Sequence, residues 1–523
     1  MASLLRYPGY MGIRLLPSLL AALSLAAPAL AADYFLDGAA GDDARDGRSD
    51  AAAWKTLERV NRHVFQPGDR LLLRAGTSLA GQLKPQGSGT AGAPIRIDRY
   101  GEGPKPQIAG GGVMPAALYL YNLEYWEVRN LDISNKGPSR QAKRCGVYVL
   151  LENFGTAHHI VLSGLDVHDV NGSLVKNEGA GYGILWENRG RQNKSRFDGL
   201  LIENCTVRRC ERNGILGWSE YWRRTDWHPS LNVVIRNNLI EQVPGDGIVP
   251  IGCDGPLVEY NVMRDCPRLL PDTEAAAGIW PWSCDNAVIQ FNEVSDHKSP
   301  WDGQGFDSDW NSRNTVIQYN YSHDNEGGFL LVCTNGEVAE PINAGNVGSI
   351  VRYNVSINDG LRATGKHAGF SPAFHISGPV KDTRIYNNLI YSNRKPAGVE
   401  RKLLKMDNWG GPWPVDTWFA NNILATEEWT AYDYGQAVNT IFLNNLYWGE
   451  HRNAPDDPKA IRADPLFLHP GLIPSGIQAL LGYRLRAGSA AIGNGLPIPD
   501  NGGRDFLGRP LPKQAAPAVG PFE

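Results

Sequence analysis

Short runs of alternating apolar and polar residues recur along most of the chain, and few stretches have helical spacing. Alternation is typical of β-strands, whose successive side chains point to opposite faces of a sheet. One exception near the N-terminus has apolar residues at helical spacing: Trp54, Leu57, Val60, Val64 and Phe65. The pattern predicts a short N-terminal capping helix, a turn at Pro67-Gly68-Asp69, and an otherwise all-β chain.

A strand-like phrase that ends in asparagine repeats through the chain, as in Val316-Ile317-Gln318-Tyr319-Asn320. The final asparagines are Asn204, Asn238, Asn261, Asn292, Asn320, Asn354, Asn388, Asn422 and Asn445, with weaker copies at Asn130 and Gly164. From Asn204 onward, successive copies are 23 to 34 residues apart. Because one coil of strands and turns cannot satisfy its own edges, such repeats stack and pair. The sequence therefore predicts a parallel β-helix, a solenoid whose asparagines stack and hydrogen-bond at one turn.

A second repeated phrase begins with glycine and an apolar residue, as in Gly305-Phe306-Asp307-Ser308-Asp309. The apolar residue after the glycine is expected to face the interior, so that positions three and five face outward. The expected outward pairs are Leu185/Glu187, Leu216/Trp218, Val249/Ile251, Trp280/Trp282, Asp307/Asp309, Leu330/Val332, His375/Ser377 and Lys405/Asp407. This predicts one outer face that carries acids, indoles, an imidazole and an ammonium in adjacent rows.

The chain divides into a leader and one elongated domain. Arg6 and Arg14 precede an apolar run over residues 15–30 that ends in Ala29-Leu30-Ala31, which is the pattern of a cleavable signal peptide. A retained N-terminal anchor is the alternative. We expect four segments: a signal peptide over 1–31, a cap and first coils over 32–110, a β-helix with the active-site face over 111–450, and closing turns of the same domain over 451–523. The expected localisation is secreted or periplasmic.

Composition narrows the range of partners. The net charge is −4 and the pI is near 6.3, which does not suggest a nucleic-acid-binding surface. No stretch after the leader could span a bilayer, so we expect a monomer without membrane contact. The seven cysteines include no cluster with zinc spacing, so we expect no metal site and at least one thiol unpaired within the chain. Cys253 and Cys284 fall at equivalent places in adjacent coils and are either stacked or disulfide-bonded.

Asp307 and Asp309 are the leading candidates for catalysis. Glycoside hydrolysis needs one carboxyl group to protonate the leaving oxygen and a second to act as nucleophile or to activate water. Two positions apart on one strand, these residues should have Cβ atoms about 6.5–7 Å apart. Mutual repulsion would raise the pKa of one of them, which suits a general acid. The alternative is a structural pair satisfied by Arg313 or by loop amides.

Other residues are candidates of second rank. Asp302 and Glu326 lie in turns that lead into strands and are further catalytic candidates, whereas Asp246 is flanked by glycine, as turn formers usually are. The expected substrate-binding residues are Trp218, Trp280, Trp282, His375, Lys405, Asp407, Glu187 and Asp324. The indoles would be platforms for sugar rings, and the alternative for them is packing beneath the loop over residues 220–230.

The phrases Tyr34-Phe35-Leu36-Asp37-Gly38, Trp54-Lys55-Thr56-Leu57 and Pro67-Gly68-Asp69 resemble the N-terminal cap of exported bacterial members of the right-handed parallel β-helix, or pectate-lyase-like, superfamily. The resemblance covers roughly residues 33–520 and implies a right-handed β-helix that acts on carbohydrate. Asp309-Trp310-Asn311 resembles the strand that carries a catalytic aspartate in the β-helical xylosidase group. That group's partner glutamate would lie near Val332, where this chain has no acid. The paired-aspartate and Gly-His-Gly pattern of polygalacturonases is also missing.

Three functions are consistent with these residues. The first is a glycoside hydrolase that cleaves a poly- or oligosaccharide with two carboxylates and no cofactor. The second is a polysaccharide lyase or epimerase that acts on a uronate polymer, with calcium on Asp307 and Asp309 and a base among His375, Lys405 and Arg362. The third is a carbohydrate-binding β-helix without catalysis, in which the acids are dispensable.

Overall fold

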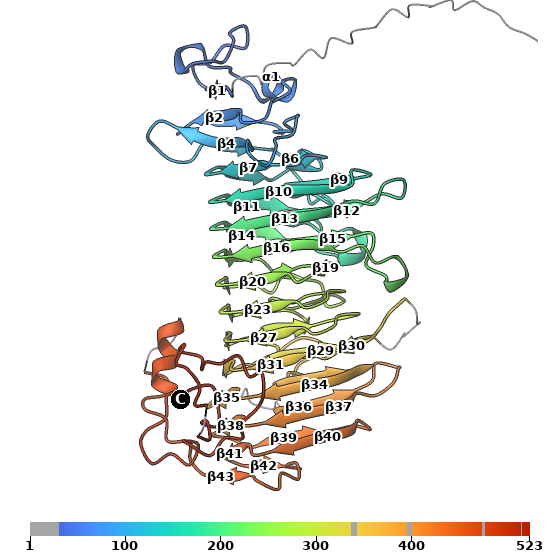
Figure 1. Cartoon of the computed structure of the whole chain (residues 1–523), viewed down its shortest axis with the longest axis vertical. Coiled ribbons are helices and arrows are strands. Elements are labelled where there is room, and N and C mark those ends of the chain that lie inside the picture. Colours follow the sequence, from blue (N-terminus) through green and yellow to red (C-terminus); the bar gives the residue numbers. More distant parts are fainter. Residues whose placement is uncertain (1–30, 336–341, 395–399, 473–475, 514) are drawn as a thin grey trace, which may run out of the picture.

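The coils of the repeat lie one above another along a single long axis (Figure 1). The computed structural model describes residues 31–335, 342–394, 400–472, 476–513 and 515–523. Nearly all of the expected signal peptide lies outside these ranges. Strands of successive coils pair in parallel, which confirms the predicted all-β parallel β-helix. No helix in the described ranges is long and apolar enough to cross a membrane.

Two of the three faces of the coil are long sheets. The 16-stranded sheet contains β1 (Asp33–Leu36), β2 (Arg70–Arg74), β4 (Ile95–Tyr100), β7 (Trp126–Arg129), β10 (Thr156–Ser163), β13 (Arg196–Glu203), β16 (Ser230–Arg236), β19 (Cys253–Asp254), β20 (Leu257–Glu259), β23 (Val288–Gln290), β27 (Val316–Gln318), β30 (Asn346–Val347), β31 (Ile350–Arg352), β34 (Val380–Tyr386), β37 (Val415–Ala420) and β40 (Val438–Leu443). The 14-stranded sheet contains β3 (Ser78–Ala80), β5 (Gln107–Ala109), β8 (Asp132–Asn135), β11 (Asp166–Asn171), β14 (Thr206–Glu211), β17 (Leu239–Glu241), β21 (Val262–Arg264), β24 (Glu293–Ser295), β28 (Tyr321–His323), β32 (Val355–Ile357), β35 (Leu389–Ser392), β38 (Ile423–Thr426), β41 (Leu446–Trp448) and β43 (Ile461–Arg462).

The third face consists of a 5-stranded and a 6-stranded sheet, joined by single bridges from Ile248 to Ile279 and from Ile279 to Phe306. Its strands are β6 (Ala116–Tyr121), β9 (Cys145–Glu152), β12 (Tyr182–Arg189), β15 (Asn213–Ser219) and β18 (Ile248–Val249), then β26 (Phe306–Ser308), β29 (Leu330–Cys333), β33 (Phe374–Ser377), β36 (Lys402–Asp407), β39 (Thr430–Asp433) and β42 (His451–Arg452). A separate pair, β22 (Ala275–Ala276) and β25 (Trp301–Asp302), lies at one corner of the coils.

In the described ranges, helical segments are few and short, as the sequence predicts. They are η1 (Asp50–Ala52), α1 (Leu57–Asn61), η2 (Lys176–Glu178), η3 (Arg224–Asp226) and η4 (Ile477–Tyr483). α1 begins where the Thr56 hydroxyl accepts a hydrogen bond from the Arg59 amide, and it buries Leu57 and Val60. It is shorter than the apolar spacing suggested, because the chain leaves the helix after Asn61 and exposes Val64.

Eight asparagines form a continuous ladder at one corner of the coils. From Asn238 to Asn422, the side-chain amide of each asparagine donates to the side-chain oxygen of the next asparagine at 2.9–3.0 Å. The last asparagine, Asn445, donates to the Asp457 carboxylate at 3.0 Å. The prediction of stacked asparagines is confirmed for these eight. The prediction is wrong by one residue for Asn204, Asn130 and Gly164. These residues have a positive φ and occupy the position just before the ladder position in their coils, as Asn237 does before Asn238. The backbone amide of Cys205, the residue after Asn204, donates to the side-chain oxygen of the first ladder residue, Asn238.

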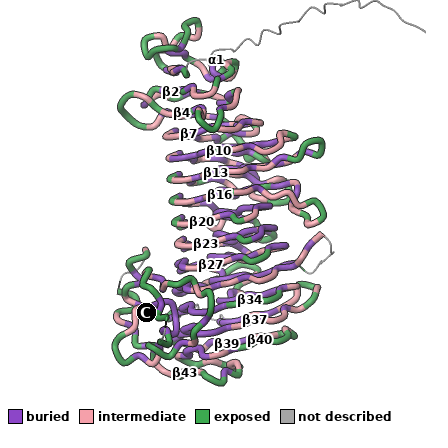
Figure 2. The backbone as a smooth tube through the Cα atoms, viewed as in Figure 1, coloured by how far each residue is buried: buried purple, intermediate pink, exposed green. Residues whose placement is uncertain are grey.

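The interior of the coils is apolar from the cap to the last tier, and Figure 2 shows buried residues in every coil. All seven cysteines are buried and unpaired, so Cys253 and Cys284 are stacked rather than disulfide-bonded. The segment after β43 returns along the outside of the coils. There its apolar side chains, including Phe506 and Phe522, share a buried cluster with Tyr319 and Tyr353 of earlier coils.

Candidate active site

Four aspartates converge on the outer side of the third face, where they line one small cavity of about 70 Å³. We call this cavity, with Asp246, Asp302, Asp307 and Asp309, the acid pocket. Its other lining residues are Lys176, Ala276, Ala277, Trp280, Leu331, Cys333 and Trp409. The pocket therefore brings together three of the four predicted catalytic residues, Asp302, Asp307 and Asp309, with the predicted sugar platform Trp280.

Strand alternation places Asp307 and Asp309 in this pocket, as predicted. Phe306 lies in the apolar interior, and the Ser308 hydroxyl points inward to Ser349 at 3.1 Å. The two carboxyl groups thus face outward on β26 and its continuation. One oxygen of each and the Cys333 Sγ atom all lie within 4.8 Å of one another.

The strand after β26 is shifted by one residue from the predicted alignment. Asp307 pairs in register with Leu331, and Leu331 pairs with His375. Leu330 and Val332 therefore lie in the apolar interior, and the prediction that they face outward is wrong. Phe329 also faces inward. Two consecutive residues at the start of β29, Phe329 and Leu330, therefore lie in the interior, and this breaks the alternation. The shift puts Cys333 beside Asp309.

Asp307 is the most enclosed acid of the outward pair. Its residue exposure is 3%, and its Oδ1 atom has no hydrogen-bond partner in the described part of the chain. Burial, followed by the charges of Asp309 and Asp302, raises the pKa of this carboxyl group well above its usual range. These surroundings favour the protonated form of Asp307.

Asp309 is less buried and better supplied with donors. Its Oδ1 atom accepts hydrogen bonds from the Trp310 amide at 2.5 Å and from the Cys333 thiol at 3.0 Å. Burial raises the pKa of Asp309, and these two hydrogen bonds act in the opposite direction because they stabilise the charged form.

Asp302 reaches the pocket from β25, in the turn that leads to β26. Its backbone has a φ of 56°, which aspartate and asparagine tolerate better than most residues. Burial raises the pKa of Asp302 to about 7; the Lys176 ammonium lowers it and the Asp309 carboxylate raises it. A carboxyl group with this pKa can both donate and accept a proton near neutral pH.

Asp246 has the opposite electrostatic environment. Its side chain accepts a hydrogen bond from the Ala277 amide at 3.1 Å and forms an ion pair with the buried Arg212 guanidinium. The Lys176 ammonium lies 3.9 Å away. Burial acts to raise the pKa of Asp246, but Lys176 and Arg212 together lower it. Asp246 is therefore an ionised anchor in the pocket, and no local pattern in the sequence indicated its two cationic partners.

Glu326 and Asp324 lie outside the acid pocket. Both follow β28, and they line a separate groove of about 660 Å³. Glu326 forms an ion pair with Arg268, and Asp324 forms ion pairs with His323 at 2.8 Å and with Arg394. The structure therefore does not bring Glu326 to the other predicted catalytic residues, because its turn opens toward the 14-stranded sheet.

Three indole rings form a stack that ends beside Asp309. The ring centroids of Trp218 and Trp282 are 6.1 Å apart and those of Trp282 and Trp310 are 4.9 Å apart, with interplanar angles of 16° and 15°. We call Trp218, Trp282 and Trp310 the indole stack. Trp222, from the loop between β15 and β16, packs against Trp282 and Trp310 at 5.3 and 5.0 Å. The loop therefore covers part of the stack, whereas Trp218 remains 41% exposed.

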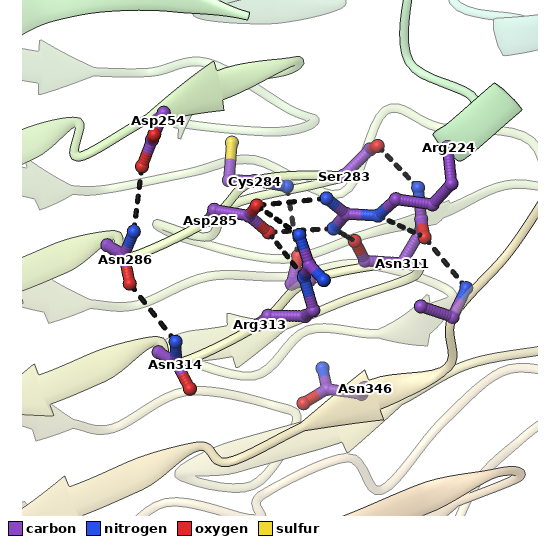
Figure 3. A network of polar contacts seen from close by, with 12 residues as sticks. Arg224, Asp254, Ser283, Cys284, Asp285, Asn286, Asn311, Arg313, Asn314 and Asn346 are labelled. Carbon is purple, nitrogen blue, oxygen red and sulfur yellow. Dashed lines mark hydrogen bonds and ion pairs between the residues drawn. The ribbon is translucent and has the colours of Figure 1, made fainter. Parts of the chain in front are cut away.

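Hydrogen bonds and ion pairs among Arg224, Asp285, Asn311 and Arg313 hold this loop against the coils (Figure 3). We call these residues the polar clasp. Arg224 donates to Asn311 at 2.9 Å and forms an ion pair with Asp285 at 2.8 Å. Arg313 binds the same Asp285 carboxylate at 2.6 Å. Arg313 is thus committed to Asp285, and the alternative in which it satisfies Asp307 and Asp309 is wrong. The backbone oxygen of Trp222 accepts a hydrogen bond from Asn311 at 3.0 Å, so the same contacts hold the residue that packs on the indole stack.

The remaining predicted binding residues lie on the same outer face but have protein partners. His375 binds Asp407 at 3.0 Å, and Lys405 binds Asp433 at 2.9 Å. Four rows before the acids, Glu187 accepts a hydrogen bond from the Tyr148 hydroxyl at 2.5 Å.

One link joins this polar region to the acid pocket. Trp409, which lines the pocket, lies with its ring centroid 5.4 Å from that of His375. Trp409 was not among the predicted binding residues, because its place in the pocket depends on the path of a loop.

Comparison with known proteins supports the fold. Residues 154–400 match the family described as the right handed beta helix region, which agrees with the predicted handedness. A lacto-N-biosidase of Bifidobacterium longum subsp. longum is 28% identical over an alignment of 612 positions, which covers 94% of this chain and 36% of that protein. The chain therefore spans about a third of the length of this relative.

Two solved structures extend the comparison. A crystal structure of a GH136 lacto-N-biosidase from Eubacterium ramulus superimposes with a TM-score of 0.60 and 28% identity, covering 80% of this chain and 68% of that chain. The complex of XylC with xylose gives a TM-score of 0.50 at 12% identity, covering 94% of this chain and 98% of that chain. The second similarity concerns the fold alone.

Proposed function

We propose that this chain is a glycoside hydrolase that cleaves a neutral oligosaccharide at the acid pocket. The observation that carries the proposal is the convergence of Asp302, Asp307 and Asp309 in one cavity beside Trp280. Hydrolysis of a glycosidic bond needs two carboxyl groups in different protonation states, and crowded, buried carboxyl groups are held in such states. The similarity to two lacto-N-biosidases supports the same class of reaction.

The environments of the acids suggest separate roles. Asp302, with a pKa of about 7, is the general acid that protonates the leaving oxygen. Asp309 is the carboxylate that attacks the sugar or activates water, because two donors on Oδ1 stabilise its charge. Asp307, kept protonated, can donate a hydrogen bond to a sugar oxygen. The indole stack next to Asp309 offers the exposed face of Trp218 to a sugar ring.

A uronate substrate fits this pocket less well. In the described part of the chain, Lys176 is the one cationic side chain among the residues that line the pocket, and it already faces Asp246. The bases considered for a lyase are engaged elsewhere: His375 with Asp407, Lys405 with Asp433, and Arg362 with the Asp302 carbonyl. A calcium ion on Asp307 and Asp309 would meet the Cys333 thiol, whereas calcium prefers oxygen ligands.

Export belongs to the same proposal and rests on the leader pattern over residues 1–31. A secreted or periplasmic monomer would meet oligosaccharides outside the cytoplasm. Detection of a mature N-terminus near residue 32 after expression would test it.

Activity should depend on Asp309 and not on the acids of the neighbouring groove. We expect the wild type to release new reducing ends from a lacto-N-biose-containing oligosaccharide or from a panel of aryl glycosides, with no effect of a chelator. Asp309→Asn should lower kcat by about a thousandfold or more, because it removes a group that acts on the reacting atoms. Glu326→Gln is the matched control and should retain activity.

Three results would contradict this assignment. An unsaturated uronate product would indicate a lyase. Sugar binding without turnover in the wild type would indicate a binding protein. Full activity of Asp309→Asn would remove the catalytic role of the pocket.

A further inference from the structure

We infer that Cys333 is a positioning residue for the catalytic carboxylate, and that its thiol holds Asp309 Oδ1 so that Oδ2 points at the substrate. This inference rests on the proposed function. The Cys333 Sγ atom lies 3.0 Å from Asp309 Oδ1 and both residues line the acid pocket. The contact exists because β29 is shifted by one residue, which places Cys333 on the outer face.

The two oxygens of Asp309 have different surroundings. Oδ1 accepts hydrogen bonds from both the Trp310 amide and the Cys333 thiol. In the ranges that the structure describes, no donor contacts Oδ2. A carboxylate held by one oxygen keeps a fixed rotamer and presents the other oxygen to a reacting atom, which is the arrangement that an attacking carboxylate needs.

The thiol is suited to be a donor and not a nucleophile. Cys333 is 1% exposed. Burial, followed by the negative charge of Asp309, raises the pKa of its thiol well above the usual range. It therefore keeps its proton, which it can give only as a hydrogen bond to a neighbouring acceptor.

The other six cysteines lack this contact. Each donates to backbone carbonyl oxygens, as Cys284 does to Pro250 at 3.4 Å. Cys333 is distinguished by a carboxylate acceptor.

The backbone around the pair is fixed from the interior of the coil. The Asn346 side chain donates to the Ser308 carbonyl at 2.6 Å and contacts the carbonyl oxygens of Asp309 at 3.3 Å and Cys333 at 3.5 Å. One amide therefore holds the ends of both strands, which keeps the thiol and the carboxylate in register.

Substitution of the thiol should shift the pH dependence of catalysis. Loss of the donor in Cys333→Ala destabilises the ionised form of Asp309, so its pKa rises. The acidic limb of the kcat/KM profile should then move up by roughly half to one pH unit, and kcat should fall about tenfold. Cys333→Ser keeps a hydroxyl donor and should restore the wild-type limb. Cys284→Ser, a buried thiol without a carboxylate partner, is the control and should leave the profile unchanged.

The outcomes separate this inference from the proposed function. If Asp309→Asn is inactive while Cys333→Ala has the wild-type acidic limb, the positioning role is overturned and the catalytic role of Asp309 stands. If Cys333→Ser and Cys333→Ala shift the limb equally, packing and not hydrogen bonding is responsible, and the inference is also overturned. If Asp309→Asn is fully active, the proposed function itself fails. Thermal unfolding of each variant shows whether a change in activity reflects loss of the folded protein.

Discussion

The asparagine ladder and the acid pocket are two clusters of buried polar side chains on the same coils, and they differ in whether their hydrogen-bonding capacity is met. In the ladder, each amide donates to the next residue and accepts from the previous one, so identical residues satisfy one another. In the pocket, Asp302, Asp307 and Asp309 cannot do so, because ionised carboxylates only accept hydrogen bonds and repel one another.

Structural and functional polar groups in a solenoid can be distinguished by whether their hydrogen-bonding capacity is met. Side chains that carry both a donor and an acceptor, such as asparagine, stabilise the fold when they stack. Carboxylates that stack have acceptors only, so their pKa values rise and an atom such as Asp307 Oδ1 has no partner. A group of the second kind reduces stability and is therefore expected to serve the reaction. The comparison can be tested at each of the two sites.

The largest expected effect is on catalysis by Asp302. Asp302→Asn should lower kcat by about a hundredfold to ten thousandfold on a substrate with a poor leaving group, because general acid catalysis is lost. The loss should be small on an aryl glycoside whose leaving group needs no proton. In the wild type, activity should fall as pH rises through about 7, where Asp302 loses its proton. Equal loss on both substrates would contradict the assigned role.

The next largest effect is expected from opening the ladder. Asn320→Ala removes an amide that donates to Asn354 and to the Ile289 carbonyl. It also removes the oxygen that accepts from the Asn292 backbone amide and from one N–H of the Asn292 side chain. We expect the free energy of unfolding to fall by roughly 3 kcal/mol, measured by denaturant or thermal unfolding. Activity per folded molecule should be retained. A stable variant would show that the ladder contributes less than its geometry suggests.

The smallest effect is expected in the pH dependence of stability. The folded pKa values of Asp302 and Asp307 are raised, so the folded state binds protons that the unfolded state has released. Stability from these groups is therefore fully present below about pH 4 and is lost as pH rises to about 7 and beyond. We expect Asp307→Asn to be more stable than the wild type by roughly 1–3 kcal/mol at pH 8 and by less at pH 5.

The control for this prediction is Glu326→Gln. The pKa of Glu326 is also raised, but Glu326 forms an ion pair with Arg268 that the substitution breaks. No gain in stability is expected from it at pH 8. A wild type that becomes more stable than Asp307→Asn as pH rises would contradict the assignment of a buried, protonated Asp307.

Much of the fold could be predicted from local pattern. The period of two places Phe306 inside and Asp307 outside without any knowledge of the rest of the chain. The recurrence of asparagine predicts the ladder from Asn238 onward. The errors at Asn204 and in the alignment of β29 were each of a single residue. Neighbouring columns of a coil carry similar residue types, so composition does not distinguish them.

Less of the candidate site could be predicted. Asp302, Asp307, Asp309 and Trp280 were identified, and the structure brings them together. Glu326 was assigned to the same site because its turn is equivalent in sequence, but that turn opens on another groove. The partners Lys176, Trp409 and Trp222 belong to loops of irregular length, for which the sequence contains no period to follow.

Local patterns are sufficient to predict the stacked coils, the outward direction of the acid pair and the apolar interior, because these follow from alternation and repetition between near neighbours. Only the folded chain shows which loops cover the outer face and by how many residues each strand is offset from the one below. The positions of these loops and the offsets of the strands determine which charged groups surround each carboxyl group. They depend on contacts between distant segments, such as Lys176 with Asp246 and Cys333 with Asp309, that no local pattern encodes.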